Sequence, residues 1–188
     1  MEVKKMLLPW IAAGAIVAGG SVYQPTDRQL DFTSTYEGYA SVPYKDIANP
    51  AILTVCHGLT DAAAGKGWVV KDKHYTEDEC RNKEIEVIGD IAKEMQPLIK
   101  ADLAQEQYEM LVDFSFNLGV PKLKSSTLLK KINKNDCFGA ANEFSRWVRS
   151  GKIVYRGLVV RRSAESDNFT KYCLPNGTFP TKGLEYGN

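Results

Sequence analysis

The chain has 188 residues, of which 44% are hydrophobic and 25% charged, and its formal net charge at pH 7 is +1. This length is sufficient for one compact domain with a hydrophobic core. Only two histidines are present and no paired Cys-x-x-Cys spacing occurs, so the sequence indicates no metal site and we expect no cofactor. No motif of a nucleic-acid-binding fold is present either, and we expect no nucleic-acid partner.

The N-terminus contains an uncharged segment. Residues 6–22 lack charged side chains and follow two lysines, Lys4 and Lys5. At a rise of about 1.5 Å per residue, this segment is near the lower limit for crossing a hydrocarbon core of roughly 30 Å, and its proline and glycines weaken it further. The lysines favour a cytoplasmic N-terminus, with the remainder of the chain outside. We therefore interpret residues 1–23 as a signal-anchor, with a cleaved signal peptide ending near residues 18–20 or a permanent anchor as alternatives.

Two carboxylates and a hydroxyl follow within a short stretch. Glu37 and Asp46 are nine positions apart, and Thr54 follows. We expect Glu37 in the last turn of a helix that Asp27 caps and Gly38 ends. The next segment is typical of a hairpin, which would carry the other two side chains opposite the helix end. Cleavage of a glycosidic bond needs a proton donor and a carboxylate on the other side of the sugar, so this pattern suggests glycoside hydrolysis. For the spacing alone, two solvated surface acids are the more common explanation.

Several motifs around these residues resemble those of one enzyme family, the phage-type lysozymes of glycoside hydrolase family 24. The resemblance spans roughly residues 28 to 173. It implies an inverting muramidase that hydrolyses the β-1,4 bond between N-acetylmuramic acid and N-acetylglucosamine in peptidoglycan. The motifs are Tyr44-Lys45-Asp46, Thr54-Val55-Cys56-His57-Gly58-Leu59-Thr60, Asp113-Phe114-Ser115-Phe116-Asn117-Leu118-Gly119, Ser126-Thr127-Leu128-Leu129, Arg146-Trp147-Val148 and Gly157-Leu158-Val159-Val160-Arg161-Arg162-Ser163-Ala164-Glu165.

The resemblance also implies roles for individual side chains. Glu37 would be the general acid, Asp46 would position the attacking water, and Thr54 would assist that water. Three further residues would contact the sugar chain: Asn117, Ser126 and Thr127.

Two departures from the family pattern are visible. Seven residues, 47–53, separate Asp46 from Thr54, where the family usually has five, and we interpret the extra residues as a lengthened hairpin turn. Leu59 occupies a position where the family generally has a histidine. We expect His57, two residues earlier, to be a structural residue rather than a catalyst.

The weak N-terminal segment resembles the anchors of signal-arrest-release endolysins of bacteriophages. That resemblance implies an inactive enzyme exported to the periplasmic face of the host inner membrane. It would be released into the periplasm when a hole-forming phage protein depolarises the membrane. We expect the released enzyme to be a monomer.

Four cysteines lie outside the N-terminal segment, which is consistent with an oxidising compartment. Four cysteines allow three pairings. We favour Cys56 with Cys80 and Cys137 with Cys173, because each pair then lies within one half of the chain. Free buried cysteines are the alternative.

The remaining patterns are mainly helical. A capping box at Thr76–Glu79 starts a helix that should run to Pro97 and join two lobes. A second strong helix, 104–118, should end at Gly119. The fold expected is α+β and mostly helical, a lysozyme-like two-lobed domain with a small β-hairpin lobe and a helical lobe joined by the long helix. The other expected segments are helices at 126–132, 136–147 and 157–173, a catalytic domain at 24–175 and a flexible tail at 176–188.

Residues 121–162 contain eleven Lys or Arg and two acidic residues. This basic half would attract an anionic polymer such as peptidoglycan, although a solvated helical surface is an equally good explanation. Two other functions are compatible with the sequence. One is a lytic transglycosylase, in which a water-positioning pair would have no task. The other is a non-catalytic wall-binding protein.

Overall fold

The computed structural model describes residues 23–45 and 51–180. The predicted signal-anchor up to residue 22, Asp46 and residues 181–188 lie outside this part of the chain. Among the described residues, no helix is both long and apolar enough to cross a bilayer.

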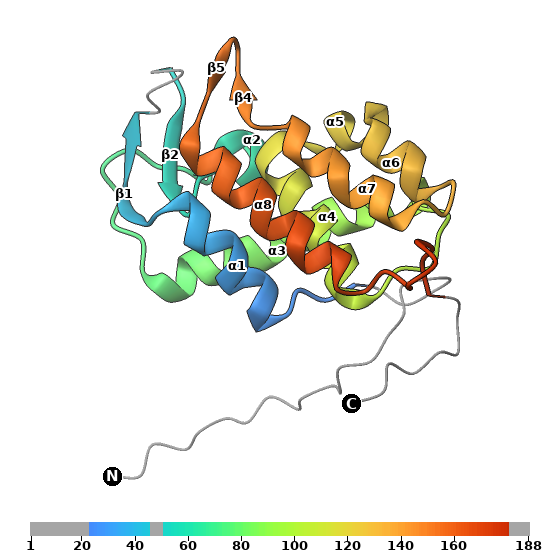
Figure 1. The fold of residues 1–188 in the computed structure, drawn as a ribbon. Coiled ribbons are helices and arrows are strands. Elements are labelled where there is room, and N and C mark those ends of the chain that lie inside the picture. Colours follow the sequence, from blue (N-terminus) through green and yellow to red (C-terminus); the bar gives the residue numbers. More distant parts are fainter. Residues whose placement is uncertain (1–22, 46–50, 181–188) are drawn as a thin grey trace.

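The predicted α+β, mostly helical architecture is confirmed (Figure 1). A small antiparallel sheet has the order β1-β2-β3 and carries the short helix α2 beside it, and a separate two-stranded hairpin, β4–β5, precedes the last helix. The strands are β1 Ala40–Lys45, β2 Leu53–Cys56, β3 Leu59–Thr60, β4 Arg149–Ser150 and β5 Ile153–Val154. The helices are α1 Asp27–Glu37, α2 Asp61–Ala64, α3 Glu77–Met95, α4 Gln105–Leu118, α5 Val120–Ser125, α6 Thr127–Ile132, α7 Cys137–Glu143 and α8 Arg156–Thr170, with 3-10 turns at Gln96–Leu98 and Phe144–Arg146.

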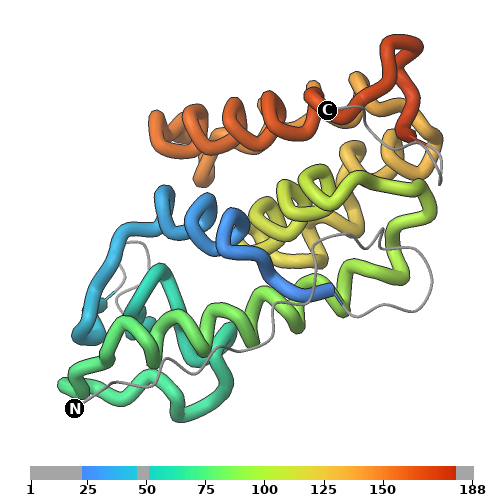
Figure 2. The backbone as a smooth tube through the Cα atoms, turned by 90° about the horizontal axis from the view of Figure 1, so that it is seen from below, coloured from blue at the N-terminus to red at the C-terminus, as the bar shows by residue number. Residues whose placement is uncertain are grey.

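Helix α3 joins two hydrophobic cores, as predicted. Thr76 and Glu79 form the complete capping box at its start. Its residue Val87 belongs to the core of the small lobe, whereas the next residue, Ile88, belongs to the core of the helical lobe. In Figure 2 this helix runs along the side of the molecule between the sheet and the other helices. The two lobes are therefore held by one rigid element, because each face of α3 is buried in a different core.

The sequence-based boundaries need three corrections. Thr26, not Asp27, caps α1, because its hydroxyl accepts a hydrogen bond from the Gln29 amide. The helix expected over 136–147 ends at Glu143 and continues as a 3-10 turn. The last helix starts at Arg156 and ends at Thr170, three residues before the expected Cys173.

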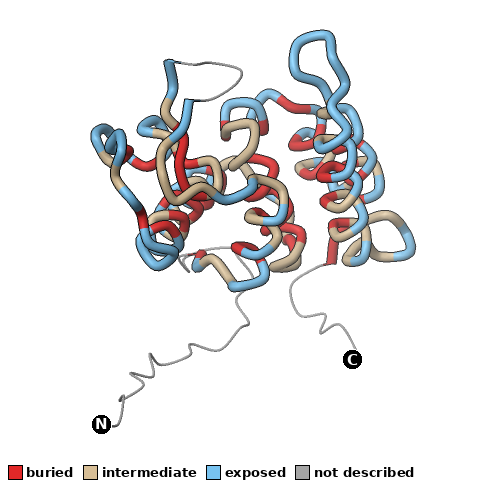
Figure 3. Tube along the Cα trace, turned by 90° about the vertical axis from the view of Figure 1, so that its left-hand side faces the viewer, coloured by how far each residue is buried: buried red, intermediate tan, exposed pale blue. Residues whose placement is uncertain are grey.

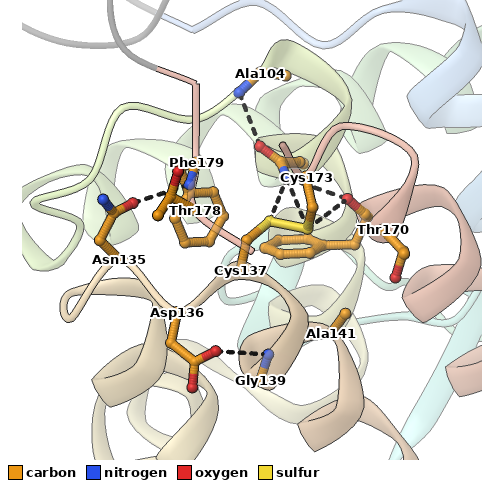
Figure 4. Close-up of a disulfide and its surroundings, with 12 residues drawn as sticks. Ala104, Asn135, Asp136, Cys137, Gly139, Ala141, Thr170, Cys173, Thr178 and Phe179 are labelled. Atoms are coloured by element: carbon orange, nitrogen blue, oxygen red, sulfur yellow. Dashed lines mark hydrogen bonds between the residues drawn. A yellow bond between two sulfur atoms is a disulfide. The ribbon is translucent and has the colours of Figure 1, made fainter. Parts of the chain in front are cut away.

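Both expected disulfides are present, Cys56–Cys80 and Cys137–Cys173. The first ties strand β2 to helix α3 inside the small-lobe core. The second connects the start of α7 to the turn after α8 (Figure 4). The Gln107 side-chain amide donates to Cys137 Sγ at 3.2 Å and lies 4.0 Å from Cys173 Sγ.

The predicted tail begins with an ordered segment. Phe179 is 2% exposed, its ring packs edge-on against Phe169 at 5.8 Å, and its amide donates to Asn135 (Figure 4). At the other end, Tyr23 is 8% exposed and its ring lies 5.1 Å from that of Tyr108. Tyr23 and Phe179, which lie just outside the predicted domain limits of 24 and 175, are therefore part of the hydrophobic core.

Candidate active site

Glu37 ends helix α1 where the chain turns toward the sheet. Gly38 has φ 67°, a left-handed conformation that glycine adopts without strain and that stops the helix. The turn between β2 and β3 packs against the Glu37 carboxylate, because a Cβ added to Gly58 (φ 80°) would lie 3.1 Å from Oε2. The Glu37 side chain is 19% exposed, so it is largely buried but still reachable from solvent.

Arg161 from helix α8 holds the other oxygen of Glu37. Its Nη1 donates to Glu37 Oε1. The same guanidinium binds Asp113 of α4 through two bonds, Nε to Oδ2 and Nη2 to Oδ1, both 2.9 Å. Thr33 of α1 donates to Asp113 Oδ1 at 2.8 Å. Burial disfavours the charged form of Asp113, but the hydrogen bonds and charge of Arg161 more than offset it and lower its pKa. Three helices thus fix the position of the Glu37 carboxylate.

A second arginine and glutamate, Arg162 and Glu165, lie next to this network on helix α8. Arg162 and Glu165 are both fully buried, with Arg162 Nη2 2.9 Å from Glu165 Oε1. Burial raises the pKa of Glu165 well above its usual value, despite the opposing charge of Arg162, and the neighbouring Asp113 raises it further. The raised pKa favours the protonated form of Glu165, which is repelled less by the neighbouring Asp113 carboxylate than a second carboxylate would be.

Glu165→Gln should stabilise the protein as the pH rises. The pKa of Glu165 is raised in the folded state, so its stabilising contribution is complete below the unfolded pKa of about 4.3 and is lost as the pH rises toward the folded pKa. Glutamine does not titrate, so the variant should gain on wild type by about 1.4 kcal/mol per pH unit within that interval. Urea unfolding at pH 4.5 and 7 measures this, with Glu94→Gln on the exposed face of α3 as control. A constant difference at both pH values would show that Glu165 is ionised.

Thr54 lies in the central strand of the sheet, as the predicted hairpin required. It is opposite Tyr44 in β1 and Thr60 in β3. Its residue is 4% exposed, and its hydroxyl oxygen is buried with no hydrogen-bond partner among the described residues. Asp46 lies outside the described residues. It directly follows Lys45, the last residue of β1, and Lys45 is paired with Leu53 of β2. A buried hydroxyl without a partner is costly and is typically found at functional sites.

The three residues expected to contact sugar have different surroundings. Asn117 accepts a hydrogen bond from Arg162 Nη2 at 3.1 Å, so it is connected to the Glu37 network. The Ser126 hydroxyl caps α6, accepting from Leu129 and donating to Leu123. Thr127 is exposed at the start of that helix. Their contact with substrate stays a prediction.

The structure explains one of the two departures from the family pattern, the leucine at position 59. Leu59 is fully buried in the small-lobe core, so this position serves packing. His57 Nδ1 lies 2.8 Å from Glu84 Oε1 in α3, which is the structural role expected for this histidine. It therefore joins the sheet to the long helix.

The arrangement of two lobes, a joining helix and a glutamate at a helix end defines a lysozyme-like fold. Solved structures agree on the fold: an endolysin from the Escherichia coli O157:H7 phage FAHEc1 superimposes with a TM-score of 0.69 at 21% identity, covering 85% of this chain and all of that one. The muramidase domain of SpmX from Asticaccaulis excentricus gives a TM-score of 0.67 at 20% identity, covering 77% of this chain and 95% of that one.

The sequence matches the phage lysozyme family over residues 34–165, and the chain belongs to that family. A SAR-endolysin of Enterobacteria phage PA-2 is 36% identical over 131 residues, which are 70% of this chain and 75% of the relative. A SAR-endolysin of Escherichia phage Mu is 34% identical over 151 residues, 79% and 82% of the two chains. The protein is thus a lytic enzyme of the glycosidase type.

Proposed function

We propose that the protein is an endolysin, a muramidase that hydrolyses the β-1,4 bond between N-acetylmuramic acid and N-acetylglucosamine in peptidoglycan. The observation that carries this proposal is the partly exposed Glu37 carboxylate, held by Arg161 at the end of α1 and packed against the β2–β3 turn. A positioned carboxyl group is the requirement for protonating the leaving oxygen. The named relatives support the same activity.

The other roles follow from the chemistry of inversion. A water must attack on the face of the sugar opposite the acid, so a second carboxylate has to activate it. Asp46 takes this role, and Thr54 orients the same water with its hydroxyl, which has no hydrogen-bond partner among the described residues. Thr54 lies in β2, paired with Tyr44, although seven residues rather than five separate it from Asp46. Asn117, Ser126 and Thr127 line the path of the sugar chain in this proposal.

Thr54→Val should slow release of soluble fragments from purified peptidoglycan by roughly 10- to 100-fold, because it removes one hydrogen bond to the water but keeps the shape of the side chain. Thr54→Ser keeps the hydroxyl and should retain most of the activity. Thr60→Val, on the neighbouring strand, is the matched control. Equal activity of Thr54→Val and Thr60→Val would remove Thr54 from the mechanism, and no release by wild type would refute the function itself.

We further propose that residues 1–23 export the enzyme and tether it, inactive, to the periplasmic face of the inner membrane. The uncharged segment 6–22 after two lysines supports this, as do relatives that carry the name SAR-endolysin. Release would follow depolarisation by a hole-forming phage protein. The free enzyme would act in the periplasm and lyse the host.

Fractionation of cells that express the full chain tests the tether. Full-length protein should be in the membrane fraction before a depolarising agent is added and in the periplasmic fraction afterwards. A shortened soluble protein without depolarisation would indicate a cleaved signal peptide. Protein that stays in the membrane would indicate a permanent anchor.

A further inference from the structure

One face of helix α1 carries buried polar side chains. Gln29, Thr33 and Glu37 follow one another at intervals of four residues, so their side chains lie along the same face of the helix. Gln29 is fully buried and Thr33 is 3% exposed. Buried and exposed residues alternate along α1, a pattern that Figure 3 shows along the helices generally. Because the buried face of a helix is ordinarily apolar, an amide and a hydroxyl on this face call for an explanation.

The polar side chains of α1 are connected to one another through α4 and α8. Gln29 Nε2 donates to Thr33 Oγ1 at 2.9 Å, and Thr33 Oγ1 donates to Asp113 Oδ1 at 2.8 Å. The Arg161 guanidinium, which binds both oxygens of Asp113, also donates to Glu37. A continuous row of hydrogen bonds therefore leaves α1 at Thr33 and returns to it one turn later at Glu37.

The Thr33 hydroxyl is directed away from its own helix. Thr35, two residues further on, donates to the carbonyl oxygen of Asp31 at 2.7 Å, which is a common arrangement for a hydroxyl side chain within a helix. Thr33 donates to another helix instead, because the Gln29 amide occupies a lone pair of its oxygen and the Asp113 carboxylate takes its proton. The Gln29 side-chain oxygen has no partner among the described residues, so the donor end of this amide makes the connection.

Asp113 and Glu37 share one cation. Arg161 is 2% exposed, and its guanidinium binds the carboxylates of both residues. The neutral Thr33 hydroxyl satisfies part of the hydrogen-bonding requirement of Asp113 without adding a charge. Without that hydroxyl, the buried Asp113 carboxylate would draw Arg161 more strongly, and the bond from Arg161 to Glu37 would weaken.

We infer that Thr33, oriented by Gln29, is a positioning residue for the general acid, because it sets how firmly Arg161 holds the Glu37 carboxyl group. This inference rests on the proposed function of Glu37. Thr33 acts only through Asp113 and Arg161 and touches no reacting atom. Its loss should therefore change the chemical step and the pH dependence of that step, but not the binding of the substrate.

Four variants of the full chain separate positioning from packing. Thr33→Val removes the hydroxyl and keeps the branched shape of the side chain, whereas Thr33→Ser keeps the hydroxyl. The matched control, Thr35→Val, makes the same change at an exposed position of α1 outside the network. Gln29→Met keeps the length of the side chain but removes the donor that orients Thr33, and it tests the inference even if Thr33→Val does not fold. Urea unfolding verifies folding, and kcat and KM for release of soluble fragments from purified peptidoglycan are measured across a range of pH.

Thr33→Val should lower kcat roughly three- to tenfold with KM unchanged, because one hydrogen bond that supports the position of the acid is lost. The alkaline limb of its kcat profile should move up by roughly 0.5 pH unit, since a carboxyl group held less firmly by a cation keeps its proton to higher pH. Gln29→Met should change both quantities in the same direction but by less. Thr33→Ser should keep most of the activity, and Thr35→Val should match wild type.

The other charged side chains around the pair of Glu37 and Arg161 are Arg162 and Glu165 on α8, and none of the variants alters them. An unchanged kcat for Thr33→Val, or equal losses for Thr33→Val and Thr33→Ser, would overturn the inference. A fall in kcat without a shift of the pH profile would overturn it as well, because a purely structural defect lowers activity equally at every pH. If wild type releases no fragments at any pH, the proposed function fails and the inference fails with it.

Discussion

Glu37→Gln is expected to reduce release of soluble fragments from peptidoglycan by at least about 100-fold, because an amide is too weak an acid to protonate the leaving oxygen. The fold should stay intact. The glutamine oxygen can still accept the hydrogen bond of Arg161, and the side chain keeps its size next to Gly58. Fragment release and urea unfolding, measured on the same preparation, separate the two effects.

The control for this substitution is Glu94→Gln, which removes one negative charge from the exposed face of α3. It should leave activity and stability within the scatter of wild type, since surface substitutions usually change stability by less than about 0.5 kcal/mol. Near-normal turnover by Glu37→Gln would show that another group protonates the leaving oxygen.

Arg161→Met should have the largest effect on stability, lowering the free energy of unfolding by about 3–5 kcal/mol at neutral pH. The substitution leaves the fully buried Asp113 carboxylate without its cation. Without the hydrogen bonds and charge of Arg161, burial should raise the pKa of Asp113, so the loss should shrink as the pH falls and that carboxylate takes up a proton. Activity should fall as well, because Glu37 loses the group that positions it.

Two further variants show which part of the effect comes from the buried charge. Arg81→Met breaks an exposed pair with Asp27 and should cost less than about 1 kcal/mol. Adding Asp113→Asn to Arg161→Met should recover part of the stability, since the unpaired charge at position 113 is removed, but should not recover activity. A cost for Arg161→Met no larger than that for Arg81→Met would contradict the assigned network.

Local patterns predicted much of the fold. The capping box at Thr76–Glu79, the stop at Gly119 and the end of α1 at Glu37 each depend on a few neighbouring residues, and all three are present in the structure. The cysteine pairs were also correct. Burial of Phe179 was missed, because a turn-rich segment gives no local sign that one aromatic side chain will enter a distant core.

The surroundings of Glu37 could not be read from the sequence in the same way. Its partner Arg161 is 124 positions away, and the contact between Thr33 and Asp113 spans 80 positions. No periodicity or capping rule connects residues at such separations. The arginine and the aspartate both lie in motifs that the family resemblance identified, but their roles became visible only when α1, α4 and α8 were packed together.

Digestion of purified peptidoglycan in water enriched in oxygen-18, followed by mass analysis of the soluble products, tests the proposed hydrolysis most directly. If Glu37 protonates the leaving oxygen and a water attacks the sugar, each new reducing muramic-acid end carries one labelled oxygen, about 2 Da heavier than in ordinary water. The Glu37→Gln variant should form no such ends above background. Unlabelled products with an internal anhydro ring would contradict hydrolysis and assign the enzyme to the lytic transglycosylases.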